Sequence, residues 1–396
     1  YCLFFATNAM VGGLFFLLKI PISASILLFL YAACLLFVPG QNFSKKILLS
    51  PFRWSVLLKG VVFLVAFFTL ISPGLNRDSF SIFRLISFGG DNISHIELTK
   101  AVEHNNGYYY RNFQTSKNVI TEGLSGYPQG LHLNIVILKQ TIDPIINLSS
   151  NFRFLVFLYA YFSAIYIICA FLFFLAVRGV ARRVSRYRTS IGIASTLILF
   201  SGLFFSLFAL GSQSQVASFM LMIPMLLFLE LTYSEGDKGL KLAYACFALI
   251  LFSGIPYTWL LLMPASAIVV AYCILDQFLM PVIAKPRRYI KLILLSFLTA
   301  ITSLTQLVVQ VMFSSPKNIG VNEIGFSIRP SIYFIASIAL VALFFIILGW
   351  QGKNARKVWL TTLLAVSLFS AAIYCYQWLN VGEARYYFYK SAYVLV

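Results

Sequence analysis

Residues 152–178 read FRFLVFLYAYFSAIYIICAFLFFLAVR, and this stretch decides the fold class. No charged residue interrupts it between Arg153 and Arg178. A helix needs about 20 consecutive apolar residues to cross a bilayer, and runs of this kind recur along the whole chain. The short alternating segments of a membrane β-barrel are absent. The sequence therefore predicts an all-α fold, a polytopic transmembrane helical bundle.

The composition agrees with this fold class. Of the 396 residues, 60% are hydrophobic and 11% are charged, whereas soluble domains carry roughly 25% charged residues. We expect about eleven spans in one transmembrane domain that covers residues 1–396. Because the sequence starts without an initiator Met and stops inside an apolar run, we expect it to be incomplete at both ends. The expected span limits are 1–18, 22–40, 56–73, 152–178, 189–210, 216–232, 240–253, 257–275, 290–313, 331–349 and 358–376.

The formal net charge of +18 comes from 30 Lys and Arg against 12 Asp and Glu. Basic clusters follow every second expected span, as the arginines that begin at Arg178 do. The positive-inside rule places short basic loops of this kind in the cytoplasm, and Lys19 and Lys317 are isolated exceptions on the opposite side. The pattern argues against a nucleic-acid-binding protein, because no basic face with interleaved aromatics lies outside the lipid phase.

This topology makes residues 74–151 a large first extracytoplasmic loop. Polar residues are costly in lipid, so polar residues gathered on one side indicate where chemistry takes place. No expected span carries an acidic residue at its centre, which argues against an ion-coupled transporter. Most of the acidic residues lie on the side of the loop: Asp78, Asp91, Glu97, Glu103, Glu122, Asp143, Glu323 and Glu383.

Within this loop, Ser94-His95-Ile96-Glu97 is a capping box of the Ser-x-x-Glu type. Apolar residues follow at near-helical spacing, and Asn105-Asn106-Gly107 is a helix stop signal. The pattern predicts an amphipathic helix of about three turns on the outer membrane surface.

Asp91 lies four residues before His95, and both side chains point to one face if the helix extends back to Asp91. A carboxylate beside an imidazole can act as a general base with its orienting partner, or bind a divalent cation. Alternatively, Asp91 caps the helix and His95 is a surface residue. The spacing leaves both interpretations open.

A second polar motif is Tyr127-Pro128-Gln129-Gly130-Leu131-His132. Pro and Gly precede an apolar run, 131–138, that is too short to span a bilayer and predicts a re-entrant or interfacial helix. The side chains of Gln129 and His132 suit sugar hydroxyls. The alternative is a structural turn that seats a half-helix.

The third motif is the tail Arg385-Tyr386-Tyr387-Phe388-Tyr389-Lys390. Arg385 and Lys390 lie on the outer side of the membrane, where the positive-inside rule disfavours basic residues. Binding of an anionic phosphate would explain why both are found there. The alternative is an aromatic belt with snorkelling cations.

Four further residues are weaker candidates for the site. The first interpretation of each is a solvated loop residue, and they are Gln213, Gln215, Tyr257 and Glu323.

Together the three motifs resemble the GT-C superfamily of integral-membrane glycosyltransferases, which take a sugar from a polyprenyl-phosphate carrier. Asp91 stands where the essential acidic residue of their first large extracytoplasmic loop would be. The motif at Tyr127 is similar to their Tyr-Pro-x-Gly element, and the tail is similar to the Tyr-Tyr-x-x-Lys element of arabinofuranosyltransferase-like members. Many members have two adjacent acidic residues, but Asn92 follows Asp91 here.

The resemblance implies an inverting, single-displacement transfer on the extracytoplasmic face of the cell membrane. Asp91 would be the catalytic base and His95 its catalytic partner, while Arg385, Tyr387 and Lys390 would bind the donor phosphate. The residues implied in substrate binding are Tyr127, Gln129, His132 and Glu323.

The implied partners are membrane lipid, a polyprenyl-phosphate-linked sugar as donor, and a cell-envelope glycan or lipid acceptor, with no nucleic acid. No cofactor is certain, although a divalent cation is compatible with Asp91. The alternative functions are a lipid-linked glycan ligase, polymerase or flippase, and then a transporter.

The six cysteines lie in or beside apolar runs and predict neither a metal site nor disulfides.

Overall fold

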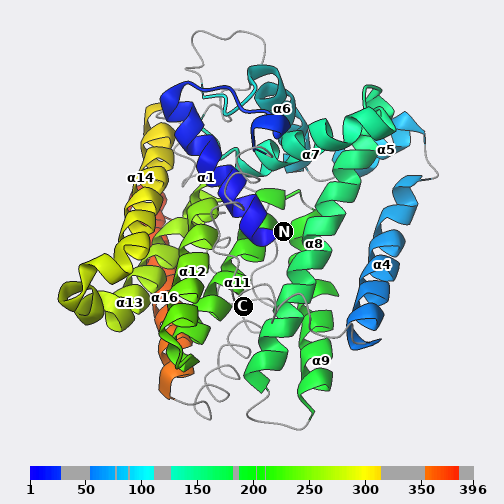
Figure 1. Cartoon of the computed structure of the whole chain (residues 1–396). Coiled ribbons are helices and arrows are strands. Elements are labelled where there is room, and N and C mark those ends of the chain that lie inside the picture. Colours follow the sequence, from blue (N-terminus) through cyan, green and yellow to red (C-terminus); the bar gives the residue numbers. More distant parts are fainter. Residues whose placement is uncertain are drawn as a thin grey trace.

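The chain is all-helical wherever the computed structural model describes it (Figure 1). The described residues are 1–27, 54–75, 78–87, 90–110, 126–181, 187–201, 203–209, 211–313 and 353–382. They form thirteen α-helices and two short 3-10 helices, and they contain no strand. The predicted fold class is therefore confirmed for this part of the chain.

Several of the described helices are separated by only a few residues, as the helices that end at Ser234 and begin at Lys238 are. Their bounds are α1 Cys2–Leu18, α4 Trp54–Leu75, α5 Ser79–Ser87, α6 Gly90–Asn105, α7 Gly130–Ile146, α8 Asn151–Ala181, α9 Arg188–Ser201, α10 Leu203–Ala209, α11 Gln213–Ser234, α12 Lys238–Thr258, α13 Met263–Ala284, α14 Ile290–Phe313 and α16 Lys353–Val381. The 3-10 helices are η3 Leu260–Leu262 and η4 Pro286–Tyr289.

Six helical stretches among the described residues are long and apolar enough to cross a membrane. They support a multi-pass membrane protein, but the count of about eleven spans is not confirmed. The expected spans 22–40 and 331–349 lie largely or wholly outside the described residues. The six stretches are Asn151–Gly179, Gln213–Ser234, Lys238–Thr258, Leu260–Ala284, Pro286–Met312 and Lys357–Asn380.

Two span boundaries differ from the expected ones. The expected span 189–210 falls on two shorter helices, α9 and α10. The expected break at Gly254-Ile255-Pro256 lies inside α12, which continues to Thr258. Pro256 lies two residues before the end of α12, and it lacks the N–H group that would donate to the preceding turn.

Helix α11 forms the centre of the bundle. Most of its side chains are buried, and it packs between α8 and α12. A helix that is apolar all round belongs in the middle of such a bundle, while its neighbours turn one face to lipid. The neighbours agree: α13 and α14 expose large apolar residues such as Met280 and Phe297.

Helices α1 and α12 approach each other closely because small residues meet at their contact. A Cβ atom on Gly254 would lie 2.8 Å from Cα of Ala6 and 2.9 Å from Cδ1 of Leu221. Small residues of this kind allow membrane helices to pack with their backbones nearly in contact.

Helices α5, α6 and α7 come from the expected loop 74–151 and lie together at one end of the bundle, at the top of Figure 1. Helix α8 begins beside α7 and runs to the opposite end, where Arg178 lies in its last turn. This arrangement is the one that the charge pattern predicts for an outer loop and a cytoplasmic basic cluster. Which end faces outward stays a prediction.

Substitution of Gly254 by Val should destabilise the protein, because the added atoms would overlap Ala6 and Leu221. Overpacking of this kind costs about 1–3 kcal/mol, so we expect a lower midpoint of thermal unfolding in detergent. Gly236→Val is the matched control, since nothing lies within 4 Å of a Cβ there. Equal midpoints for the two variants would contradict the close contact between α1 and α12.

Candidate functional site

Helix α6 carries the first predicted motif, and it starts earlier than the sequence suggests. It begins at Gly90, so Ser94 lies inside the helix and the predicted capping box is wrong. The predicted end is confirmed, because Asn106 follows the helix in the left-handed region at φ 49°. The early start puts Asp91 in the first turn of the same helix as His95.

Asp91 and His95 have opposite environments. Asp91 is exposed, whereas His95 is only 2% exposed. His95 is therefore no surface residue, and that alternative is wrong. Asn92, between them, is also buried and donates its side-chain amide to the backbone oxygen of Ile86 in α5 over 2.9 Å.

His95 joins three segments of the chain. Its Nδ1 lies 2.9 Å from Nε2 of His132 in α7, and its Nε2 lies 3.0 Å from the backbone oxygen of Gly211 before α11. The two imidazole rings are stacked, with 5.1 Å between their centroids. The motifs that begin at Asp91 and Tyr127 thus meet in the folded chain.

The hydrogen-bond partners of His95 and His132 indicate which of their ring nitrogens carry a proton. A carbonyl oxygen only accepts, so Nε2 of His95 donates to Gly211. In a neutral His95, Nδ1 then accepts from Nε2–H of His132, and Nδ1 of His132 keeps its lone pair. Burial, and next the neighbouring His95, hold the pKa of His132 well below its usual value, which agrees with a neutral ring.

Position 211 requires a glycine. Its φ of 85° favours glycine, and a Cβ atom there would lie 2.8 Å from the backbone nitrogen of Asn92. The turn at Gly211 thereby brings its carbonyl oxygen to His95 and the start of α11 to the start of α6.

Tyr127 completes this group, which we name the histidine cluster: His95, Tyr127, His132 and Gly211. The Tyr127 ring meets both imidazoles edge-on, at centroid distances of 6.2 Å to His95 and 6.3 Å to His132. Burial, together with the negative charge of Asp91, raises the pKa of Tyr127 above its usual value. Asp91 is therefore close enough to act electrostatically on the cluster.

Buried polar atoms without a hydrogen-bond partner among the described residues are spread through the bundle, and several of them belong to the histidine cluster or to residues close to it in sequence. These include Asn92 Oδ1, His132 Nδ1, Gln213 Oε1, and both amide atoms of Gln215. An unpaired buried polar atom costs about 1–3 kcal/mol, so such atoms indicate a place where water or a polar ligand binds. Sequence reasoning interpreted Gln213 and Gln215 as solvated loop residues, which is wrong, because each is 1% exposed in the first turn of α11.

Gln129 of the second motif and Asn134, two residues after it, make structural contacts. The side-chain amide of Gln129 accepts from the backbone nitrogen of Tyr109 over 2.7 Å and donates to its backbone oxygen over 2.6 Å. Asn134 accepts from the amide of Asn8 over 2.8 Å and donates to Gly130 in its own helix. Gln129 thus holds the segment around Tyr109, and its predicted part in substrate binding stays a prediction.

The other small candidate, Tyr257, is not a loop residue. It is 1% exposed in the last turn of α12 and donates to the backbone oxygen of Thr302 over 2.7 Å. Four further predicted site residues, Glu323, Arg385, Tyr387 and Lys390, lie outside the described residues. In the described part of the chain, no group of three or more His, Cys, Asp or Glu could hold a metal ion.

Lowering the pH should destabilise the protein through His132. Its pKa is lower in the folded chain than the value of about 6.5 in an unfolded one, so the folded state binds fewer protons. The stabilisation is complete above about pH 6.5 and is lost as the pH falls from there towards the folded pKa, by up to about 1.4 kcal/mol per pH unit.

The measurement is the unfolding midpoint between pH 8 and pH 5 in nanodiscs. His132→Gln should weaken the dependence on pH, and His104→Gln, which changes an exposed histidine on α6, should leave it as it is. An unchanged dependence in His132→Gln would show that another group carries it.

No protein-family model, curated protein or solved structure matches this chain. Its function is therefore inferred from its own residues.

Proposed function

We propose that the protein is a GT-C-type membrane glycosyltransferase, which moves a sugar from a polyprenyl-phosphate carrier to a cell-envelope glycan or lipid acceptor. The observation that carries this proposal is the position of Asp91. It is an exposed carboxylate one helical turn before the buried His95, at one end of a bundle whose helices α13 and α14 expose large apolar residues.

The proposed reaction is a single displacement with inversion. Asp91 takes the proton from an acceptor hydroxyl while that oxygen attacks the anomeric carbon of the donor sugar. The bond from this carbon to the phosphate oxygen breaks, and the polyprenyl phosphate leaves with its negative charge. A general base of this kind contributes a rate factor of about 10²–10⁴.

The histidine cluster would position the base. His95 ties α6 to α7 and to the turn before α11, so the first turn of α6, which holds Asp91, is fixed against two other segments. A base held by packed neighbours loses less freedom when the substrate binds. Arg385 and Lys390 would stabilise the charge on the leaving phosphate.

The proposal predicts that Asp91→Asn abolishes transfer. The purified protein in nanodiscs would be given polyprenyl-phosphate-linked mannose, glucose or arabinofuranose with labelled sugars, and transfer to extracted envelope lipids and glycans would be measured. Loss of the base should lower the rate by about 10²–10⁴.

Asp78→Asn is the matched control, since Asp78 is an exposed acid that caps α5 at Ser81, and Asn caps helices equally well. It should retain activity. An Asp91→Asn variant with the wild-type rate would rule out Asp91 as the base.

A lipid-linked glycan ligase, polymerase or flippase is the alternative that a second measurement separates. A transferase of the proposed kind should use donors in which one phosphate joins the sugar to the polyprenyl chain. In the proposed reaction the leaving group is a polyprenyl monophosphate, whose charge Arg385 and Lys390 would stabilise. Equal concentrations of monophosphate- and pyrophosphate-linked mannose in the same nanodiscs would be compared. Transfer from the pyrophosphate donor alone would contradict the proposal and favour the alternative.

A further inference from the structure

Two of the stretches that are long enough to span a membrane meet at a basic segment. Leu260–Ala284 ends immediately before Lys285, and Pro286–Met312 begins immediately after it. Residues 285–291, which we name the basic turn, read KPRRYIK and carry four cations. Because a single residue separates the two stretches, the basic turn cannot extend away from the membrane surface that both reach. It therefore lies at the level of the lipid headgroups.

The basic turn has a defined structure between α13 and α14. Lys285 follows the last residue of α13, and Pro286–Tyr289 form η4. The backbone nitrogen of Arg288 donates to the backbone oxygen of Lys285 over 3.1 Å. The ring of Tyr289 is buried and meets Phe278 of α13 edge-on, with 5.9 Å between the ring centroids. The backbone that carries the cations is therefore held against α13.

The four cations of the basic turn, Lys285, Arg287, Arg288 and Lys291, are all exposed. Three of them recur every third residue, and side chains at this spacing in a 3-10 helix lie on the same side. Neither of the two ion pairs between described residues includes any of the four. Cations this close together repel one another, so an anion from outside the chain would stabilise the basic turn.

The acidic residues of the surrounding helices have other partners. Helices α12 and α14 contain none. Asp276, the acidic residue of α13, pairs with Lys357 of α16 over 3.2 Å. Glu230 of α11 accepts from Nε1 of Trp359 over 3.1 Å. No carboxylate of α12, α13 or α14 is thus left to neutralise the basic turn.

Apolar side chains are exposed in both helices next to the basic turn. Such a surface would be unfavourable in water, but it suits the acyl chains of lipids. A lipid whose chains pack there brings its headgroup to the level of the four cations. The exposed residues are Leu279, Met280 and Ile283 in the last two turns of α13, and Ile290, Ile293, Leu294 and Phe297 in the first two turns of α14.

Two simpler explanations account for only part of this charge. The positive-inside rule favours basic residues on the cytoplasmic side, but it does not require them to lie together without carboxylates. The dipole of α13 favours a cation at its end, as Lys285 is. Lys291, however, lies in the first turn of α14, where the helix dipole disfavours a cation. An anion outside the chain explains both lysines.

We propose that the basic turn binds the headgroup of an anionic phospholipid. The guanidinium groups of Arg287 and Arg288 donate to the phosphate oxygens, and Lys285 and Lys291 act as point charges. Each basic residue at an anionic membrane surface contributes a factor of about five in affinity. Four of them together therefore distinguish anionic from zwitterionic lipid. The proposal does not rest on the proposed function, and it stands or falls without any transfer reaction.

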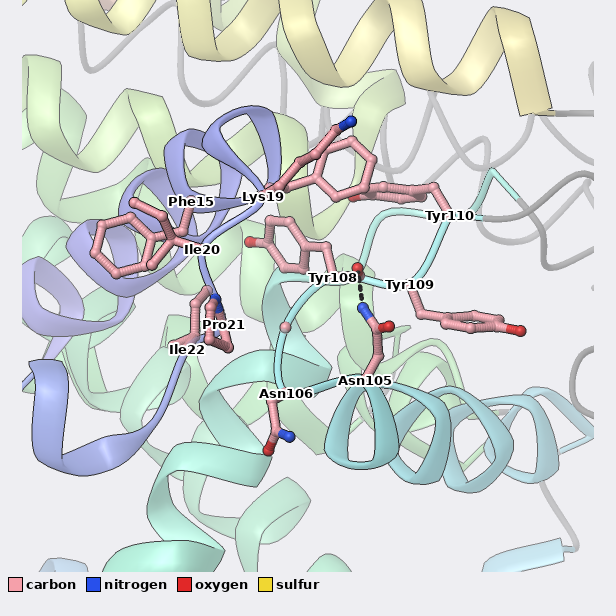
Figure 2. A pocket seen from close by; sticks show the side chains of 12 residues that line it. Phe15, Lys19, Ile20, Pro21, Ile22, Asn105, Asn106, Tyr108, Tyr109 and Tyr110 are labelled. Carbon is pink, nitrogen blue, oxygen red and sulfur yellow. Dashed lines mark hydrogen bonds between the residues drawn. The ribbon is translucent and has the colours of Figure 1, made fainter.

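Lys19, near the other end of α14, provides the comparison. It borders a pocket of about 340 Å³ between the ends of α1 and α6, as Asn106 does (Figure 2). Tyr110 of the same pocket donates to Oε1 of Gln306 over 2.7 Å, and Gln306 lies about 24 Å after Ile290 along α14. Lys19 is the one charged residue that lines this pocket. A single cation of this kind should give little preference for anionic lipid.

Lipid binding can be measured directly on the full chain in detergent. The protein would be titrated with phosphatidylglycerol and with phosphatidylcholine of the same acyl chains, and the bound lipids would be counted by native mass spectrometry. We expect the first phosphatidylglycerol to bind about tenfold more tightly than phosphatidylcholine. The double variants Lys285→Gln/Lys291→Gln and Arg287→Gln/Arg288→Gln should each lower this preference about fivefold.

The matched control is Lys19→Gln/Lys100→Gln. Both lysines are exposed, and Lys100 lies in α6, away from the basic turn. This variant loses the same net charge by the same kind of substitution as Lys285→Gln/Lys291→Gln, and it should keep the wild-type preference. Arg287→Lys/Arg288→Lys keeps the charge and should retain most of the preference.

A second measurement uses the unaltered chain, so it does not depend on the folding of any variant. Nanodiscs of phosphatidylcholine alone, and of an equal mixture with phosphatidylglycerol, would be treated with an acetylating reagent, and the rate at each lysine would be read by peptide mass spectrometry. An anionic surface slows the reaction at every lysine near it. A bound headgroup should slow it further at Lys285 and Lys291, but not at Lys19 and Lys100.

Equal slowing at these four lysines would overturn the proposal. The same lipid preference in Lys285→Gln/Lys291→Gln and in its matched control would overturn it as well. Inorganic phosphate that displaces phosphatidylglycerol at equal concentration would identify a free anion, and not a lipid, as the ligand, which also contradicts the proposal.

Discussion

The hydrogen bonds of His95 hold together the end of the molecule that carries α6 and α7. This one ring connects α6, α7 and the turn before α11, and α11 is the central helix of the bundle. A buried imidazole with partners on both nitrogens keeps its ring in one orientation, because any rotation leaves a buried polar group unpaired. The short helices at the top of Figure 1 are thereby attached to the apolar core instead of lying loosely on it.

The same constraint explains why the polar groups gather where they do. The bundle centre is filled by α11, whose neighbours cover it with Leu, Phe and Ala, so the spanning part offers few partners for polar side chains. At the start of α11 the chain leaves this apolar region. Gln213 and Gln215 are buried there beside Gly211, which provides the close approach to α6. The result is a polar layer between an exposed carboxylate, Asp91, and an apolar bundle.

Much of the fold was open to prediction because hydropathy has a direct physical cause. Long uncharged runs must be helical in lipid, since every backbone group needs a partner within its own helix. The six stretches long enough to span follow from this, whereas the helices of residues 74–151 were predicted from helix stop signals and from Pro and Gly before an apolar run. The helix bounds were harder to predict. Ser94 satisfied the capping pattern, yet the chain is already helical at Gly90, and Asn92 in the first turn donates to the backbone oxygen of Ile86 in α5.

The all-helical fold class, the apolar stretches, the two polar motifs and the isolated cation Lys19 could be predicted from the chain alone, because each follows from local composition and spacing. The hydrogen bond between His95 and His132, the burial of Gln213 and Gln215, and the pocket that Lys19 and Asn106 border depend on the folded structure. Such contacts join residues far apart in the chain, and no periodicity encodes which polar side chain meets which. The packing of the helices brings them together.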